Sequence, residues 1–182
     1  AARTNRIIAI TSTKDPKEIR DQFLTALNIE PQSQYWAFPH ATHPLETSII
    51  FEIHAPQSPL CILLTSGSSG QPKAVVHSFY TLWSAATFSN NNIGLSSGDR
   101  WLLSLSLWHI GGLMIPIRAL LGGASIVVKV HTLGEHIERD SITHLSLVST
   151  QLNDLLQESR DFSSLTTVLV GGGTIPPGLI DT

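Results

Sequence analysis

The sequence predicts an α/β fold with a mostly parallel sheet and flanking helices, and its pattern of apolar segments supports this. From about residue 60 to the end of the 182-residue chain, short apolar runs alternate with helical segments. Such alternation is typical of βαβ units. The chain is 42% hydrophobic and 14% charged, and soluble domains usually reach about 25% charged residues. We therefore expect part of its apolar surface to be covered by further protein.

The first sixty residues contain fewer regular elements. Residues 6–11 (RIIAIT) predict a buried strand. A helix over 16–28 is predicted by the sequence Asp-Pro-Lys-Glu, which supplies an N-cap, a proline at the first helical position and an acid three residues after the cap. Residues 30–59 are rich in Pro, Gln, Ser and His and are predicted to be irregular, with a strand at 48–53 left open.

Later elements follow at a regular spacing. Ser78 is expected to cap the first of the later helices, and a Gly-Gly pair to end the second. The predicted strands cover residues 61–65, 74–77, 101–105, 124–130, 143–148 and 167–170. The predicted helices cover residues 78–90, 111–121, 133–139 and 150–157. In the last of these helices, Leu152, Leu155 and Leu156 are expected to share one face.

Charge, cysteine content and hydropathy exclude several classes of protein. A net charge of −3 argues against a protein that binds nucleic acid or an anionic membrane. The chain's one cysteine, Cys61, rules out a disulfide framework and a four-cysteine zinc site, and it suits a reducing compartment. Residues 101–117 lack Asp, Glu, Lys and Arg, but their Ser, His, Gly and Pro residues argue against a membrane span.

Histidine and tryptophan positions are interpreted structurally. His40/His43 and His131/His136 have loose metal-like spacing, but no carboxylate or cysteine cluster accompanies them, so we expect solvated surface histidines and no metal ligands. The tryptophans on apolar faces are expected to lie in the core: Trp83, Trp101 and Trp108.

The loop after the strand at 61–65 carries the clearest chemical signal. It reads Thr-Ser-Gly-Ser-Ser-Gly-Gln-Pro-Lys from Thr65 to Lys73. Its glycines remove bulk, its hydroxyls supply donors, and the exposed amides of such a loop form an anion-binding nest. The loop does not match a Walker motif or a nucleophile elbow, and its place directly after a strand argues against a flexible linker. It therefore predicts phosphate binding.

This loop closely resembles the signature T-S-G-[ST]-[ST]-G-x-P-K-G of the adenylate-forming superfamily of acyl-CoA synthetases, peptide-synthetase adenylation domains and luciferases. Ala74 stands where most members have Gly. Three later segments agree in order and spacing: LSLWH at 105–109 followed by Gly-Gly, SLVSTQL at 146–152 and LVGGGTIP at 169–176. Within the superfamily, the sequence looks most like the o-succinylbenzoate–CoA ligases of menaquinone biosynthesis.

The resemblance implies that ATP and a carboxylate give an acyl-adenylate and pyrophosphate, and that CoA then displaces AMP. By resemblance, His109 and Lys73 would be catalytic, with His109 lining the acyl pocket and the approach of the CoA thiol; a core histidine is the alternative. The nucleotide would be held by Thr65, Ser66, Gly67, Ser68, Ser69, Gly70, Lys73, Gly171, Gly172 and Gly173. The acyl substrate would contact His109, Ser149, Thr150 and Gln151. A helix cap by Ser149 or Thr150 is equally expected.

The resemblance covers roughly residues 60–182, which we expect to form a partial ATP- and acyl-binding subdomain of a large N-terminal domain, after a leader at 1–59. The family's Mg²⁺-binding acid, ribose-binding Asp and C-terminal Lys do not occur in these 182 residues. We therefore expect an internal fragment that does not turn over alone. The resemblance implies ATP, Mg²⁺, CoA and a small carboxylate as ligands, in the cytoplasm; a homo-oligomer is left open. Two alternatives to an o-succinylbenzoate–CoA ligase stay open: another aryl or fatty acyl-CoA synthetase, and a non-catalytic nucleotide-binding module.

Overall fold

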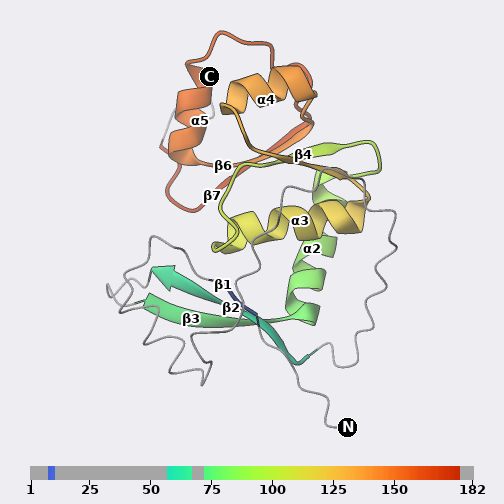
Figure 1. Ribbon diagram of the computed structural model, residues 1–182, viewed down its shortest axis with the longest axis vertical. Helices are drawn as coiled ribbons and strands as arrows, with labels where there is room; N and C mark the ends of the chain where they lie inside the picture. Colours follow the sequence, from blue (N-terminus) through green and yellow to red (C-terminus); the bar gives the residue numbers. More distant parts are fainter. Residues whose placement is uncertain (1–7, 11–56, 67–71, 177–182) are drawn as a thin grey trace. The chain divides into compact units, whose positions relative to one another are not determined.

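The computed structural model describes residues 8–10, 57–66 and 72–176, which contain two β-sheets (Figure 1). The first sheet has the strand order β1-β2-β3 and the second the order β5-β4-β6-β7. The first sheet comprises β1 (Ile8–Ile10), β2 (Pro59–Ser66) and β3 (Pro72–Ser78). The second comprises β4 (Arg100–Leu103), β5 (Ser125–Val128), β6 (His144–Val148) and β7 (Thr167–Gly171). The predicted helix at 16–28 and the open strand at 48–53 lie outside the described residues.

The helices begin and end close to their predicted limits. They are α2 (Phe79–Ile93), α3 (Ile110–Gly122), α4 (Leu133–Asp140) and α5 (Ser149–Leu156). The Ser78 hydroxyl accepts a hydrogen bond from the Thr81 amide at 3.1 Å, which confirms the predicted cap of α2. Gly123 ends α3 in the left-handed region at φ 73°, which glycine adopts without strain. Within the described part of the chain, no helix has the length and apolar character needed to cross a membrane.

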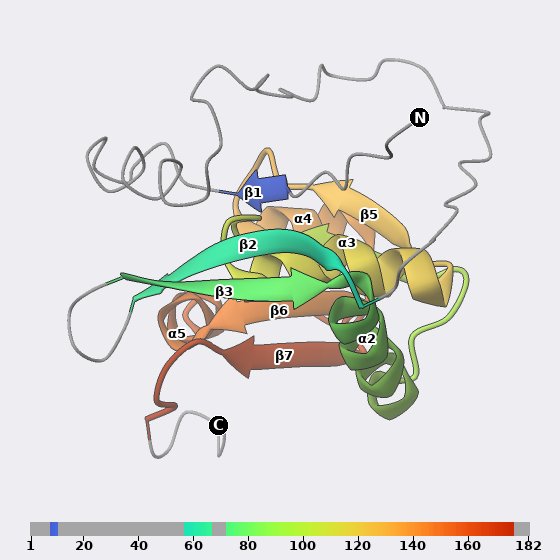
Figure 2. The ribbon, with the colours of Figure 1, turned by 90° about the horizontal axis from the view of Figure 1, so that it is seen from below.

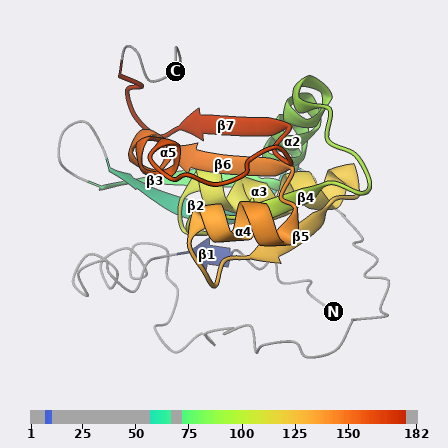
Figure 3. The same ribbon diagram turned by 90° about the horizontal axis from the view of Figure 1, so that it is seen from above.

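The fold is α/β and mostly parallel, as the sequence predicts. In the second sheet all neighbouring strands are parallel, and Figure 3 shows β6 and β7 side by side and pointing the same way. In the first sheet, β1 pairs with β2 in parallel, whereas β2 and β3 form an antiparallel pair (Figure 2). The antiparallel pair has a physical cause: five residues, 67–71, separate the two strands, and a parallel crossover needs a dozen or more connecting residues.

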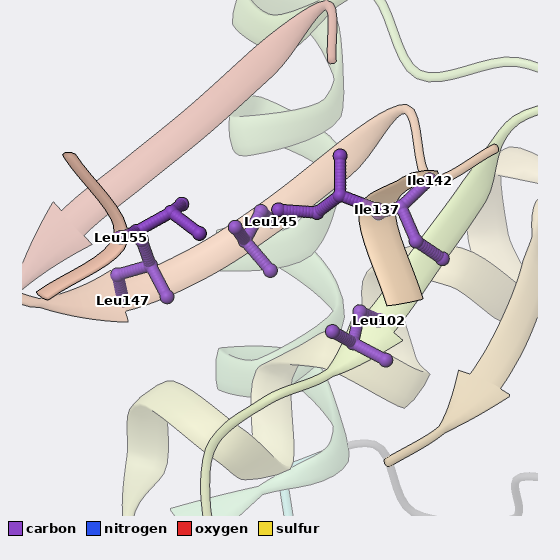
Figure 4. Close-up of a cluster of buried hydrophobic side chains, with 6 residues drawn as sticks. All are labelled: Leu102, Ile137, Ile142, Leu145, Leu147 and Leu155. Atoms are coloured by element: carbon purple, nitrogen blue, oxygen red, sulfur yellow. The ribbon is translucent and has the colours of Figure 1, made fainter. Parts of the chain in front are cut away.

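One face of the second sheet is covered by α4 and α5, and its other face contacts α3 (Figure 1). The core beneath α4 and α5 consists of side chains that are at most 4% exposed (Figure 4): Leu102, Ile137, Ile142, Leu145, Leu147 and Leu155. Burial of each such side chain stabilises the fold by about 1.5–3 kcal/mol. Leu152 also packs here, whereas Leu156, the last residue of α5, is 44% exposed. The face that the three leucines share is therefore buried only in part.

A second apolar cluster joins β2 to α2 and α3. Its buried members are Cys61 of β2, Leu82 and Ala86 of α2, and Met114 of α3. Burial raises the pKa of the Cys61 thiol above its ordinary value, which keeps this cysteine in its neutral, unreactive form. The cluster therefore uses Cys61 as a small apolar side chain.

The tryptophan and histidine predictions are partly corrected. Trp101 is fully buried as expected, whereas Trp83 is 43% exposed on α2 and stacks on Phe79, with ring centroids 5.1 Å apart. His136 is not a surface histidine, since it is 2% exposed. Its Nε2 atom accepts hydrogen bonds from the amides of Val130 and His131. These bonds satisfy two backbone donors of the β5–α4 connection, which explains the burial.

Candidate nucleotide and acyl site

The antiparallel pair β2–β3 holds the two ends of the Ser/Gly-rich loop together. Thr65 lies opposite Lys73 and Ser66 opposite Pro72 in the strand register. The Thr65 hydroxyl donates a hydrogen bond to the Lys73 carbonyl at 3.3 Å, and both residues are exposed. Gly67, Ser68, Ser69 and Gly70 lie outside the described residues. The structure thus places the first and last candidate phosphate ligands, Thr65 and Lys73, side by side at one end of a hairpin.

The remaining candidate residues leave the second sheet at its carboxyl edge. Val148, the last residue of β6, is paired with Gly171, the last residue of β7. The segments 149–151 and 171–173 therefore start from adjacent strand ends. Gly172 has φ 81°, and a Cβ atom there would lie 3.3 Å from Val148 Cγ1, so this position requires glycine. A Cβ atom on Gly171 or Gly173 would meet nothing within 4 Å.

The start of α5 differs from the expected cap. The helix begins at Ser149, and no hydroxyl caps it; instead Gln151 Oε1 accepts a hydrogen bond from the Val148 amide at 3.1 Å. The alternative that Ser149 or Thr150 caps the helix is therefore wrong. Neither hydroxyl is hydrogen-bonded within the described residues, and Thr150 is exposed. Both remain available to a ligand, whereas the Gln151 carbonyl oxygen is already engaged.

His109 lies at the end of the loop that follows β4. It occupies the N-cap position of α3 but makes no side-chain capping bond, and it is exposed. The alternative that His109 is a core histidine is therefore wrong. Its backbone is held at both ends, because its amide donates to the Ser106 carbonyl at 3.1 Å and its carbonyl accepts from the Leu113 amide at 2.9 Å.

The strand order places these segments at a switch point of the sheet. From β4 the chain moves to β5 on one side, and it then returns to β6 on the other side of β4. Ligands of open α/β sheets bind in the crevice at the carboxyl ends of the strands where the direction of winding changes. The loop that ends at His109 leaves β4, and the segment 149–151 leaves β6. Sequence-distant candidates therefore share the edge where such folds bind ligands.

Several buried polar side chains escaped the sequence analysis. Side-chain atoms that are buried and have no hydrogen-bond partner among the described residues belong to Asn90, Trp101, Arg118, His144 and Ser146. Four of them are connected: Asn90 donates to the Arg118 carbonyl at 2.9 Å, the Arg118 guanidinium lies 5.8 Å from the Trp101 ring centroid, and the Trp101 and His144 rings are 5.4 Å apart. Buried polar atoms without partners are uncommon in folded proteins, which makes this cluster unusual.

Arg118 is the charged member of this cluster. Burial lowers the pKa of its guanidinium, but arginine keeps its charge in proteins. No carboxylate of residues 57–66 or 72–176 lies within ion-pair distance of it. A sequence signal for this residue exists: Arg118 is the one Asp, Glu, Lys or Arg between Arg100 and Lys129. A lone charge in such an apolar stretch is a reason to expect a function.

The amino edge of the same sheet carries a polar network around Asp99, which includes His144 of the cluster above. Burial acts to raise the pKa of Asp99, but hydrogen bonds from the amide and hydroxyl of Ser96 and from Thr143, together with the nearby His144, lower it overall. His144 Nδ1 lies 3.8 Å from Asp99 Oδ1. This network lies at the end of the sheet opposite the candidate site and is assigned to stability.

The described residues contain no group of three or more His, Cys, Asp or Glu side chains that could hold a metal ion. His131 and His136 lie near each other, with ring centroids 5.4 Å apart. Both ring nitrogens of His136 are engaged, however, since Nε2 accepts two amide hydrogen bonds and Nδ1 lies 2.5 Å from Asp140 Oδ2. The pair is therefore structural. His40 and His43 lie outside the described residues.

Comparison with known proteins gives a consistent picture. A 2-succinylbenzoate–CoA ligase of Bacillus cereus (strain AH820) is 32% identical over 146 residues, which cover 76% of this chain and 30% of the relative. The ligase of the same name from Bacillus subtilis (strain 168) is 34% identical over 125 residues, 66% of this chain and 26% of the relative. The chain thus spans less than a third of the length of these relatives.

Solved structures of ligases with similar names resemble this chain as well. The O-succinylbenzoate coenzyme A synthetase (MenE) of B. subtilis in complex with AMP superposes with a TM-score of 0.74 at 26% identity, covering 95% of this chain and 50% of that one. A variant of E. coli MenE with bound OSB-AMS gives a TM-score of 0.71 at 30% identity, covering 94% of this chain and 39% of that one. The model of the family described as AMP-binding enzyme matches residues 4–182. The chain therefore belongs to the AMP-binding, adenylate-forming enzyme family.

Proposed function

We propose that the protein containing this chain is an ATP-dependent, AMP-forming acid–CoA ligase, and that its acid is o-succinylbenzoate. The observation that carries the proposal is the meeting of the His109 loop, residues 149–151 and residues 171–173 at the carboxyl edge of the second sheet. An exposed hairpin with the adenylate-forming signature supplies the matching phosphate loop. We also propose that the chain divides between residues 59 and 60 into a leader and a partial ATP- and acyl-binding subdomain, and that the protein lies in the cytoplasm.

The hairpin loop is proposed to hold the β- and γ-phosphates of ATP. Attack of a carboxylate on the α-phosphate builds negative charge on the phosphoryl oxygens, so catalysis depends on positioning and on opposite charge. Lys73 is exposed at the hairpin end and supplies that charge, while Thr65 beside it supplies a hydroxyl. The other proposed ligands are Ser66, Gly67, Ser68, Ser69 and Gly70.

The carboxyl edge is proposed to hold the adenylate and its acyl group. Gly171, Gly172 and Gly173 carry no side chains, which lets the adenine and acyl group approach the backbone closely. Ser149 and Thr150 would contact the acyl group through their hydroxyls, which have no hydrogen-bond partner among the described residues, and Gln151 would do so through its side-chain amide nitrogen. His109 is exposed at the edge and would line the approach of the CoA thiol. Mg²⁺, when bound with ATP, neutralises phosphate charge; we place its main acidic ligand outside this chain.

The choice of acid is supported by the names of the relatives, which are 2-succinylbenzoate–CoA ligases. o-Succinylbenzoate has two carboxylates, so one remains charged when the other is activated. This second carboxylate needs a cation in the acyl pocket. A fatty acid or a simple aryl acid would leave that cation without a counter-charge, which is costly in a partly buried site.

The proposal is tested by ATP–pyrophosphate exchange with the complete natural protein. o-Succinylbenzoate is compared with 3-benzoylpropanoate, which lacks the ring carboxylate, and with a fatty acid. We expect exchange with o-succinylbenzoate to exceed exchange with either alternative by at least about 100-fold, since loss of a partner for a buried charge costs about 3 kcal/mol or more. Preference for another acid would remove this substrate. Exchange with none of the acids, together with ATP binding, would favour a non-catalytic module.

The 182-residue chain by itself is proposed to be inactive, so acyl-CoA formation by the isolated chain would contradict that part.

A further inference from the structure

The path of the chain after β4 is set by an unusual arrangement at Ser104. The ladder between β4 and β6 consists of one Cα pair among the described residues, Trp101 opposite His144. Past this pair, the Ser104 amide turns back to the Leu102 carbonyl at 2.8 Å, which ends the strand. The Ser104 hydroxyl then donates to the Ser146 carbonyl of β6. A side-chain bond therefore connects the two strands where their backbones no longer pair.

This bond lies in a nearly dry environment. Ser104 is 9% exposed and Ser146 is 4% exposed. A buried carbonyl that loses its donor bears a desolvation penalty of about 1–3 kcal/mol. The bond joins the residue that follows β4 to the middle residue of β6, the two strands between which the winding of the sheet changes direction. It therefore fixes where the loop after β4 starts.

A second contact holds the same loop from the other side. Gly112, in the first turn of α3, is buried, and a Cβ atom there would collide with the Ser106 carbonyl and lie 2.8 Å from the Leu105 carbonyl oxygen. The helix thus packs directly on the backbone of residues 105 and 106. The Ser106 carbonyl in turn accepts the hydrogen bond of the His109 amide at 3.1 Å. The chain of contacts runs without a gap from Ser146 to His109.

We propose that Ser104 is a positioning residue: its hydroxyl bond to Ser146, together with the close approach allowed by Gly112, sets where His109 lies at the carboxyl edge. Ser104 acts through the loop and does not touch the reacting atoms. The inference rests on the proposed function, because the place of His109 matters for catalysis only if acyl transfer to CoA occurs there. A displacement of about 1 Å in such a position can lower a rate up to about 100-fold.

The first test uses the complete natural protein with Ser104→Ala, Ser104→Thr and the control Ser125→Ala. Ser125 is exposed at the opposite edge of the same sheet. Thioester formation is followed from preformed acyl-adenylate and CoA. We expect Ser104→Ala to lower the rate at least tenfold with an unchanged KM for ATP, and threonine, which keeps the hydroxyl, to restore it to within about threefold. An unchanged rate in Ser104→Ala, or a threonine variant as slow as the alanine variant, would overturn the proposal.

A second measurement needs no variant and no CoA activity. Amide hydrogen exchange of His109 in the unmodified protein is compared with that of the β4 amides. If the Ser104–Ser146 bond and the Gly112 contact hold the loop, the His109 amide must exchange as slowly as the β4 amides. It can open only if the loop leaves Ser146 and α3. Exchange at the rate of an unprotected amide would refute the proposal even if Ser104→Ala does not fold. Absence of ligase activity in the unmodified protein would instead refute the proposed function.

Discussion

The substitution His136→Ala is expected to destabilise the connection between β5 and α4. In the folded protein His136 Nε2 accepts hydrogen bonds from the amides of Val130 at 2.9 Å and His131 at 3.0 Å. Because Nε2 is the acceptor, the ring proton lies on Nδ1 and donates to Asp140. One imidazole therefore satisfies two backbone donors and joins the two ends of α4. Alanine removes all of these bonds.

The size of the effect follows from burial. His136 is 2% exposed, and each buried donor that loses its acceptor costs about 1–3 kcal/mol. Two donors would cost about 2–6 kcal/mol on that scale, but Val130 is 69% exposed, so water can reach its amide once the ring is gone. We therefore expect a loss of about 2–4 kcal/mol in the free energy of unfolding. Such a loss is a large part of the stability of an ordinary domain.

The assay is denaturant unfolding followed by circular dichroism, with amide exchange of Val130 and His131 as the local measurement. The control is His131→Ala, which removes an exposed imidazole of the same connection and is expected to change stability by less than about 0.5 kcal/mol. His136→Gln, whose amide oxygen can replace Nε2 as acceptor, should recover part of the loss. A change below 0.5 kcal/mol in His136→Ala, with both amides still protected, would refute the reasoning about magnitude.

Three further outcomes are expected. The pKa of Asp99 is lowered despite its burial, so its contribution to stability is present above the unfolded pKa of about 3.9 and is lost as the pH falls below that value. Asp99→Asn should therefore flatten the acid limb of a curve of unfolding free energy against pH. An unaltered limb would contradict this. Gly172→Ala should lower the free energy of unfolding, measured by thermal unfolding, by about 1–2 kcal/mol, because φ is 81° and Val148 is close. Gly173→Ala serves as the control, since there is open space at its Cβ position. Equal effects of the two variants would disprove the conformational argument. Lys73→Ala should lower the rate of ATP–pyrophosphate exchange by at least about tenfold. It should not alter the melting temperature, since the side chain is exposed. An unchanged exchange rate would remove Lys73 from the phosphate site.

Local features of the fold could be predicted because they depend on neighbours in the sequence. The cap at Ser78 and the helix end at Gly123 are set within one turn of each helix, and both are confirmed. The strands at 143–148 and 167–170 are apolar runs long enough to be recognised alone, and the structure has them at His144–Val148 and Thr167–Gly171. Errors occurred where burial decides, as at Trp83, which lies on an apolar helix yet stays exposed.

The candidate site was predicted in part for the same reason. The phosphate loop and the segments near His109, residues 149–151 and residues 171–173 were found because each is a contiguous motif. Their individual roles remain predictions. For Arg118 the sequence offers only a lone charge in an apolar stretch, since the burial of its guanidinium beside Trp101 depends on tertiary packing.

By itself, the sequence determined the α/β class, most element boundaries and the family signature, because periodicity, caps and motifs are short-range properties of the chain. The tertiary structure alone decided that β2 and β3 pair antiparallel and that the second sheet has the order β5-β4-β6-β7. It also decided that His136 is buried against two amides and that Ser104 bonds to Ser146. The bond between Ser104 and Ser146 joins residues 42 positions apart, and the strand order also depends on pairing between elements that are remote in sequence. No local pattern encodes such contacts, because their free energy arises only when both partners are buried together.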